Sequence, residues 1–344
     1  MSFFKRFLTR SKTTPEESKK PVLNTGTHVS APQLIALQQQ ARKLDLNKQT
    51  YATASTTGTH RSRFRGRGMD YQESRIYQAG DDIRNMDWRV TARSGKPHTK
   101  LYQEERERPV VFLVDFNSSM FFGSTHSLKS VVATKVAAML AWSVALKGDR
   151  IGALLINKEH HELAPKMGKR GALQLIRQLV NFSNPQTGLA NSDESSNNTN
   201  NFNEELQRLR KLARPGTLIV LISDFYKIND ETQHHLRRLS QHNDLLAIQI
   251  VDPLELTPPP ANRYRVTNGV GQSGVLDTRS KKGLQSYQDF FAKHHQQVHE
   301  LMRRQQIPLI QISTADDVTL SLQKYFGSKQ RAAIANATTV KQVA

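Results

Sequence analysis

Three oxygen-bearing side chains with alternating spacing could bind a cation. Asp115, Asn117 and Ser119 lie at positions i, i+2 and i+4, directly after the apolar run Val110–Val114. Alternate residues of an extended segment point the same way, so the three side chains can converge on one point. Carboxylate, amide and hydroxyl oxygens suit a hard cation such as Mg²⁺. The same residues could instead form a strand-to-helix turn that caps the next helix.

A second carboxylate stands in an equivalent place later in the chain. Asp224 comes after Ser223, which ends the apolar run Thr217–Ile222. Because the carboxyl ends of parallel strands line one crevice in an open α/β sheet, we expect Asp224 beside Asp115. Taken alone, Asp224 could also cap the helix that follows it. The order of the predicted elements, in which strand 110–114 is followed by a helix and further strands, places both carboxylates in one sheet and favours a shared cation site.

The elements that must position these residues follow from the hydrophobic pattern. Continuous apolar runs rich in β-branched residues predict buried strands of a parallel sheet. The predicted strands are 110–114, 151–156, 217–222, 245–251 and 307–313, with an edge strand at 160–165. The predicted helices are 33–46, 127–147, 170–182, 202–212, 230–242, 281–306 and 317–326. This alternation predicts an α/β fold, doubly wound, with a mostly parallel sheet.

The segment before the first buried strand mixes opposite charges. Its arginines are Arg75, Arg84, Arg89 and Arg93, and its carboxylates are Glu73, Asp81, Asp82 and Asp87. We expect these groups to pair with one another and to fix a compact, turn-rich unit. Ile83 and Trp88 are its expected apolar anchors. The arginines and glycines of residues 61–68 offer an alternative, contact with nucleic acid.

Composition limits the possible classes of protein. The chain has 344 residues, 37% of them hydrophobic, no cysteine and a formal net charge of +19. Such a charge attracts polyanions, which include nucleic acid, anionic membranes and acidic proteins. No apolar run reaches the roughly 20 residues needed to span a bilayer, so we expect a cytoplasmic protein with at most peripheral membrane contact. No phosphate-binding glycine loop and no activated nucleophile is recognisable, and we therefore expect no enzyme.

Two motifs together resemble the bacterial family named domain of unknown function 58. The first comprises Gly80–Arg84, Asp87-Trp88, Ala92-Arg93 and Glu105-Arg106, and the second is the turn Asp115–Met120. The resemblance extends from about Arg61 to Phe326 and implies a von Willebrand factor A-like domain. The turn is similar to the metal-ion-dependent adhesion site of those domains, with Asn117 in place of the usual Ser.

The resemblance also implies further ligands and a partner. In von Willebrand factor A domains a Thr from a later loop supplies a third oxygen ligand, and Thr199 is the matching residue here. Asp224 matches the second acidic position. The family implies a divalent-cation-dependent adaptor for a MoxR-type AAA+ ATPase, with a partner carboxylate completing the Mg²⁺ shell. The alternative function is nucleic-acid binding through the basic surface.

The domain organisation follows from the same features. We expect a flexible basic arm with one helix over residues 1–59 and an Arg/Asp-rich β lobe over 60–108. The von Willebrand factor A-like domain should cover 109–327, before a disordered tail at 328–344. A two-stranded ribbon in the insertion 254–280 is marginal alone, so we expect it to pack on the β lobe.

Overall fold

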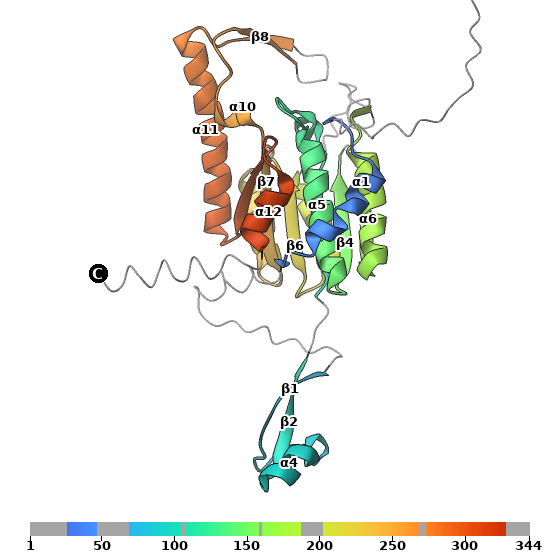
Figure 1. Ribbon diagram of the computed structural model, residues 1–344. Helices are drawn as coiled ribbons and strands as arrows, with labels where there is room; N and C mark the ends of the chain where they lie inside the picture. Colours follow the sequence, from blue (N-terminus) through green and yellow to red (C-terminus); the bar gives the residue numbers. More distant parts are fainter. Residues whose placement is uncertain are drawn as a thin grey trace, which may run out of the picture.

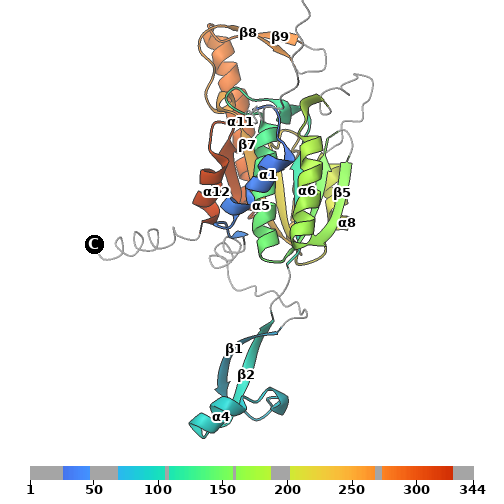
Figure 2. The same ribbon diagram turned by 45° about the vertical axis from the view of Figure 1, so that its right-hand side comes forward.

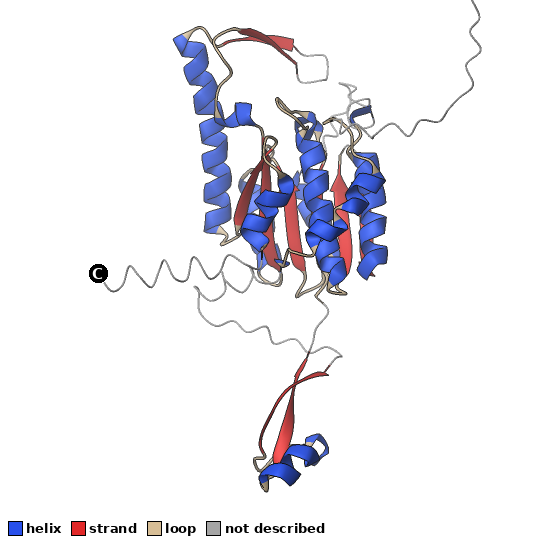
Figure 3. Cartoon of the chain, in the orientation of Figure 1, coloured by secondary structure: helices blue, strands red, loops and turns tan. Residues whose placement is uncertain are grey.

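A six-stranded sheet with helices on both faces forms the body of the protein (Figures 1 and 3). The computed structural model describes residues 26–46, 69–104, 108–157, 160–186, 202–267 and 273–327. The strand order is β10-β7-β6-β3-β4-β5, and only β5 runs antiparallel to its neighbour. The strands are β3 (Val110–Asp115), β4 (Arg150–Ile156), β5 (His160–Met167), β6 (Leu218–Ser223), β7 (Asp244–Val251) and β10 (Leu309–Ser313). The predicted doubly wound α/β fold is confirmed.

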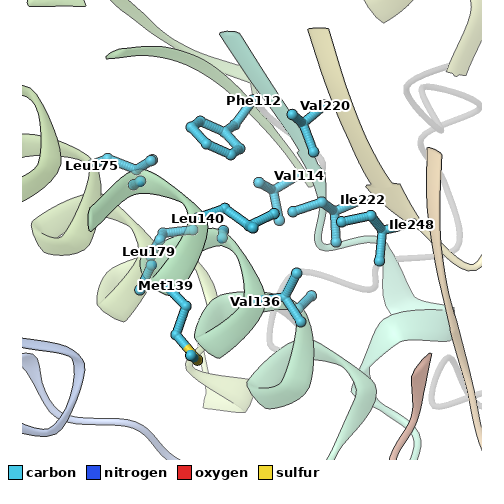
Figure 4. Close-up of a cluster of buried hydrophobic side chains, with 14 of the residues drawn as sticks. Phe112, Val114, Val136, Met139, Leu140, Leu175, Leu179, Val220, Ile222 and Ile248 are labelled. Atoms are coloured by element: carbon cyan, nitrogen blue, oxygen red, sulfur yellow. The ribbon is translucent and has the colours of Figure 1, made fainter. Parts of the chain in front are cut away.

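Two apolar layers enclose the sheet, because neighbouring residues of a strand point to opposite faces. Phe112 and Val114 of β3 belong to one layer, and Val111 and Leu113 belong to the other. The first layer is covered by α1 (Ala31–Ala36), α2 (Gln38–Ala41), α5 (Lys129–Leu146), α6 (Gly168–Phe182) and α12 (Val318–Phe326). The second is covered by α8 (Phe202–Leu212), α9 (Asp230–Ser240) and α11 (Lys281–Arg304). Figure 4 shows part of the first layer, where α5 and α6 pack on the central strands.

Helix α5 is buried on nearly all sides, because the sheet covers its inner face and other segments cover its outer face. The Trp142 indole N–H donates to the Leu34 carbonyl at 3.0 Å, and the Ser143 hydroxyl donates to the Leu44 carbonyl at 3.0 Å. By length and composition α5 could cross a membrane, but 89% of it is buried inside the protein. Residues 26–46 therefore pack on the body instead of forming a flexible arm, and the helix predicted at 33–46 is present as the two short helices α1 and α2. The rest of that arm, and the tail at 328–344, lie outside the described residues.

Two small β ribbons extend from the body at opposite ends (Figures 1 and 2). One contains β1 (Met69–Ile76), η1 (Ile83–Asn85), α4 (Trp88–Ser94) and β2 (His98–Glu104). The other, β8 (Arg263–Thr267) paired with β9 (Ser273–Asp277), contacts α11. The prediction that the two ribbons pack into one lobe is wrong in this structure. The second ribbon is supported by the helix that follows it, so it does not need the first.

Candidate functional site

The carboxyl ends of β3 and β6 bring Asp115 and Asp224 to the same edge of the sheet. These two strands are direct neighbours, and Asp115 ends β3 while Asp224 follows the last residue of β6. Both side chains are almost fully buried, with exposed fractions of 4% and 2%. The Ser223 hydroxyl donates to Asp115 Oδ2 at 2.7 Å and accepts from the Phe225 N–H at 2.9 Å. Ser223 thus ties the two strand ends together.

The turn after β3 wraps around Asp115. The backbone N–H and the side-chain amide of Asn117 donate to Asp115 Oδ1 at 2.8 Å and 2.7 Å. Ser119 lies in the short 3₁₀ helix η2 (Ser118–Phe121), and both Asn117 and Ser119 are half-buried. Both side chains are therefore partly accessible to solvent. We call the group Asp115, Asn117, Ser119 and Asp224 the crest site.

Neither carboxylate caps a following α-helix, although Asn117 stands at the N-cap position of η2 without a side-chain capping bond. Helix α5 begins at Lys129 with Leu128 at the N-cap position, well after the turn at 115–119. Helix α9 begins at Asp230, and Asn229 rather than Asp224 caps it. Asp224 instead accepts from the Tyr226 N–H in its own turn at 3.3 Å, and Asp115 accepts from Ser223 and Asn117.

A buried lysine, which the sequence analysis missed, contacts the crest site. Lys129 is 1% exposed, and its Nζ donates to Asp224 Oδ2 at 2.9 Å and to Glu255 Oε1 at 2.7 Å. Burial alone would lower the pKa of Lys129, but the charges of Asp224 and Glu255 outweigh it and raise the pKa. Lys129 is therefore a fixed ammonium that joins the loops after β3, β6 and β7. One signal was available, since a cation in the first turn of a helix opposes the macrodipole and needs a carboxylate partner.

The crest carries more negative charge than Lys129 can neutralise. Asp224 and Glu255 share the one ammonium, and Asp115 is a third carboxylate that interacts with the charge of Asp224. Burial, and then the charge of Asp224, raise the pKa of Asp115 from 3.8 to about 6, despite the hydrogen bonds from Ser223 and Asn117. A carboxyl group with a raised pKa is one whose charge is poorly compensated. An added cation would relieve this charge.

The loop after β7 holds the other side of the lysine. Asp252 is fully buried and accepts hydrogen bonds from the Ser124 N–H at 2.8 Å and the Thr314 hydroxyl at 2.7 Å. Its own N–H donates to Glu255 Oε2 at 3.1 Å, which orients Glu255 in α10 (Pro253–Leu256) toward Lys129. Burial would raise the pKa of Asp252, but the hydrogen bonds, led by that from Ser124, lower it. Asp252 is therefore a structural anion that fixes the loop.

An aromatic pair packs against the lysine. The Tyr226 ring lies 5.1 Å from Lys129 Nζ and stacks on His294 of α11 at a centroid distance of 4.3 Å. His294 Nε2 also lies 3.1 Å from the Asp224 carbonyl oxygen. Between them, Phe225 adopts a positive φ of 59°, unusual for a bulky residue, and is buried against Phe202. The turn that carries Asp224 is thus held in one conformation by Lys129, His294 and Phe202.

The residue types at the crest, two carboxylates with an amide and a hydroxyl, are those that bind divalent cations such as Mg²⁺. Among the described residues no group of three or more His, Asp or Glu side chains has a metal-binding arrangement. A cation here would therefore depend on the neutral oxygens as well as the two carboxylates. Thr199, the third predicted ligand, lies outside the described residues.

Comparison with known proteins assigns the family. The family model described as "Protein of unknown function DUF58" matches residues 73–297. The chain belongs to this family. An uncharacterized protein of Mycobacterium tuberculosis is 27% identical over 300 residues, which cover 86% of this chain and 90% of the relative. The family resemblance drawn from the two sequence motifs is confirmed.

Partial structural similarity to solved proteins accompanies the family match. The conserved hypothetical protein BatB from Bacteroides thetaiotaomicron aligns over 63% of this chain and 96% of its own, with a TM-score of 0.39 and 12% identity. Manganese-loaded TRAP protein from Plasmodium vivax aligns over 42% of this chain and 57% of its own, with a TM-score of 0.29 and 17% identity. The sheet topology of this DUF58 member is established by its own strand order.

Proposed function

We propose that this DUF58 protein is a protein-interaction module whose crest site binds a divalent cation, Mg²⁺ in the first instance. The observation that supports the proposal is the poorly compensated negative charge at the buried ends of two adjacent strands. Asp115 and Asp224 supply the charge, while Asn117 and Ser119 supply neutral oxygens on the solvent side. When bound, the cation supplies a Lewis-acidic position that a carboxylate from another protein can occupy.

The chain's own residues prepare the site for this role. Lys129 holds Asp224 Oδ2 and the Tyr226 N–H donates to Asp224 Oδ1 at 3.3 Å, so the carboxylate keeps a fixed orientation. Ser223 and Asn117 orient the Asp115 carboxylate in the same way. Because the side chains are already fixed, little conformational entropy is lost when a ligand binds. An acidic partner also gains from the net charge of +19, which speeds its approach.

The family resemblance suggests a MoxR-type AAA+ ATPase as the partner, in protein maturation or remodelling. The ATPase would contribute a Glu or Asp side chain to the cation. We expect the complex to form in Mg²⁺ and to dissociate in EDTA. Asn117→Ser should retain binding because a hydroxyl replaces an amide oxygen, whereas Asp115→Ala should lose it.

The first test is metal-dependent stability of the protein alone. Ligand binding stabilises a native state by about 2.7 kcal/mol at a hundredfold excess over Kd. In a body of this size that corresponds to roughly 5–10 °C in Tm. Asp224→Asn should remove the Mg²⁺-dependent shift. Asp316→Asn is the matched control, because Asp316 is an exposed carboxylate after the edge strand β10.

The second test is capture of the purified ATPase by wild type, Asn117→Ser, Asp115→Ala and the Asp316→Asn control. Binding that ignores EDTA and survives Asp115→Ala, but is lost at moderate salt, would reject the cation bridge. Loss of binding at moderate salt is typical of contacts with phosphate groups, so that result would favour the alternative function of nucleic-acid binding. A wild type whose Tm responds to neither Mg²⁺ nor EDTA would reject the metal site itself.

A further inference from the structure

The unit formed by residues 69–104, which we call the small lobe, has a polar interior. Asp87 and Thr99 are the buried residues among its described side chains, with exposed fractions of 6% and 4%. Asp87 accepts from the Ser74 hydroxyl at 2.7 Å and from the Val90 N–H at 3.1 Å. Its backbone N–H donates to the His98 carbonyl at 2.8 Å. Hydrogen bonds around Asp87 therefore link α4 to both strands of the ribbon.

Three large apolar side chains of the small lobe are exposed to solvent. Ile76, Ile83 and Trp88 are 55%, 63% and 67% exposed. Ile83 and Trp88 are the expected anchors of this unit, so that prediction is wrong. A Trp is usually among the most buried residues of a protein, because its ring removes a large apolar area from water. Trp88 and Ile83 therefore form exposed apolar surface on the small lobe.

Unpaired arginines accompany the exposed Trp. Arg75 is held by Asp81 at 2.7 Å, as predicted. Arg84, Arg89 and Arg93 are exposed and have no ion pair within the described part of the chain. Arg89 and Arg93 are four residues apart on α4 and share one face of that helix. Trp and Arg are the residue types that most often dominate the binding energy of protein interfaces.

The composition of this surface identifies the class of partner. Ile76 and Ile83 offer aliphatic surface, which suits a protein and has no role in stacking against nucleic-acid bases. The arginines suit carboxylates, which they bind in a bidentate manner. A second copy of the chain would bring the same arginines and the same net charge of +19, and would be repelled.

We propose that the small lobe is a docking surface for an acidic segment of a partner protein. Trp88 and Ile83 are its apolar anchors, and Arg84, Arg89 and Arg93 are its carboxylate ligands. The surface is separate from the crest site, because β2 leads into the amino end of β3 and the crest lies at the carboxyl end. Binding at the small lobe therefore needs no divalent cation.

The test is selection of a displayed library of random dodecapeptides on the full-length protein, in EDTA and at physiological salt. Peptides that also bind the support without the protein are removed by counter-selection. We expect the remaining peptides to be enriched in Asp and Glu together with large apolar residues. For a synthetic peptide of the selected sequence, Trp88→Ser should weaken binding about thirtyfold, the effect of truncating a central interface residue. Arg89→Glu should also weaken it.

Two matched controls change equally exposed residues on the body. Leu320→Ser removes an apolar side chain that is 66% exposed, and Arg237→Glu reverses an exposed charge on α9. Both should leave peptide binding unchanged, and all four variants should keep the wild-type Tm. The proposal is overturned if no peptides are enriched, if they lack acidic residues, or if Trp88→Ser binds them as well as wild type does. Preferential binding of oligothymidylate, or self-association abolished by Trp88→Ser, would also overturn it.

Discussion

Replacing Lys129 with Met should lower the stability of the body substantially. The substitution keeps an unbranched side chain but leaves Asp224 and Glu255, which are 2% and 6% exposed, without their shared cation. Removing one partner of a buried ion pair costs about 3–5 kcal/mol. One kcal/mol changes Tm by about 2–4 °C in a protein of this size, so Tm should fall by roughly 6–20 °C. The measurement is thermal unfolding at neutral pH in EDTA.

A matched substitution on the same helix gives the control. Lys135 is also on α5, and burial lowers its pKa despite the nearby charge of Asp317. A lysine whose pKa is lowered is one whose charge is unfavourable in the native state. Lys135→Met should therefore be neutral or slightly stabilising, the opposite of Lys129→Met.

A compensating variant separates charge from packing. Adding Asp224→Asn and Glu255→Gln to Lys129→Met removes all three charges and should restore most of the lost stability, because a fully neutral cluster leaves no uncompensated ion. If Lys129→Met melts like Lys135→Met, the ammonium does not stabilise the crest. If the triple variant is no more stable than Lys129→Met, the loss comes from packing and the electrostatic argument is wrong.

Three further outcomes follow from the structure. The pKa of Asp115 is raised to about 6 in the native state, so ionised Asp115 destabilises the fold above that pH, and the penalty disappears as the pH falls toward 3.8. In EDTA, the stability of wild type relative to Asp115→Asn should therefore increase by up to about 3 kcal/mol between about pH 8 and pH 4. Unchanged relative stability would contradict the shift. Asp87→Ala should increase hydrogen exchange in residues 73–100 while the Tm of the body stays constant, because the hydrogen bonds of Asp87 are all within the small lobe. Protection like that of wild type would refute this role. Leu34→Ala should lower the free energy of unfolding by about 2–5 kcal/mol, since Leu34 is fully buried against α5. A change near zero would show that residues 26–46 do not contribute to the core.

The carboxyl-edge position of two site residues was predictable from local sequence. Continuous β-branched runs form strands buried on both faces, and parallel strands place their carboxyl ends together. The end of β3 therefore carries Asp115 and the end of the neighbouring β6 is followed by Asp224. Asn117 and Ser119 follow because they are within four residues of Asp115. Each of these inferences needs only the period of the pattern and the direction of the strands.

Long-range contacts decided the rest. Lys129 meets carboxylates that are 95 and 126 residues away in sequence, and nothing local to a lysine at a helix start identifies such partners. The all-apolar surface of α5 required a cover, but only the fold assigns that cover to residues 26–46. Ile83 and Trp88 were expected inside because apolar residues usually are.

The small lobe shows the limit of that rule. A two-stranded ribbon with one short helix has too little volume to enclose a Trp ring, so hydrogen bonds around Asp87 hold it and the ring stays at the surface. Sequence determined which residues form strands and where each strand ends, because those properties depend on neighbours in the chain. Tertiary structure decided which charges are paired and which apolar groups are covered, because both depend on segments that meet only after the chain has folded.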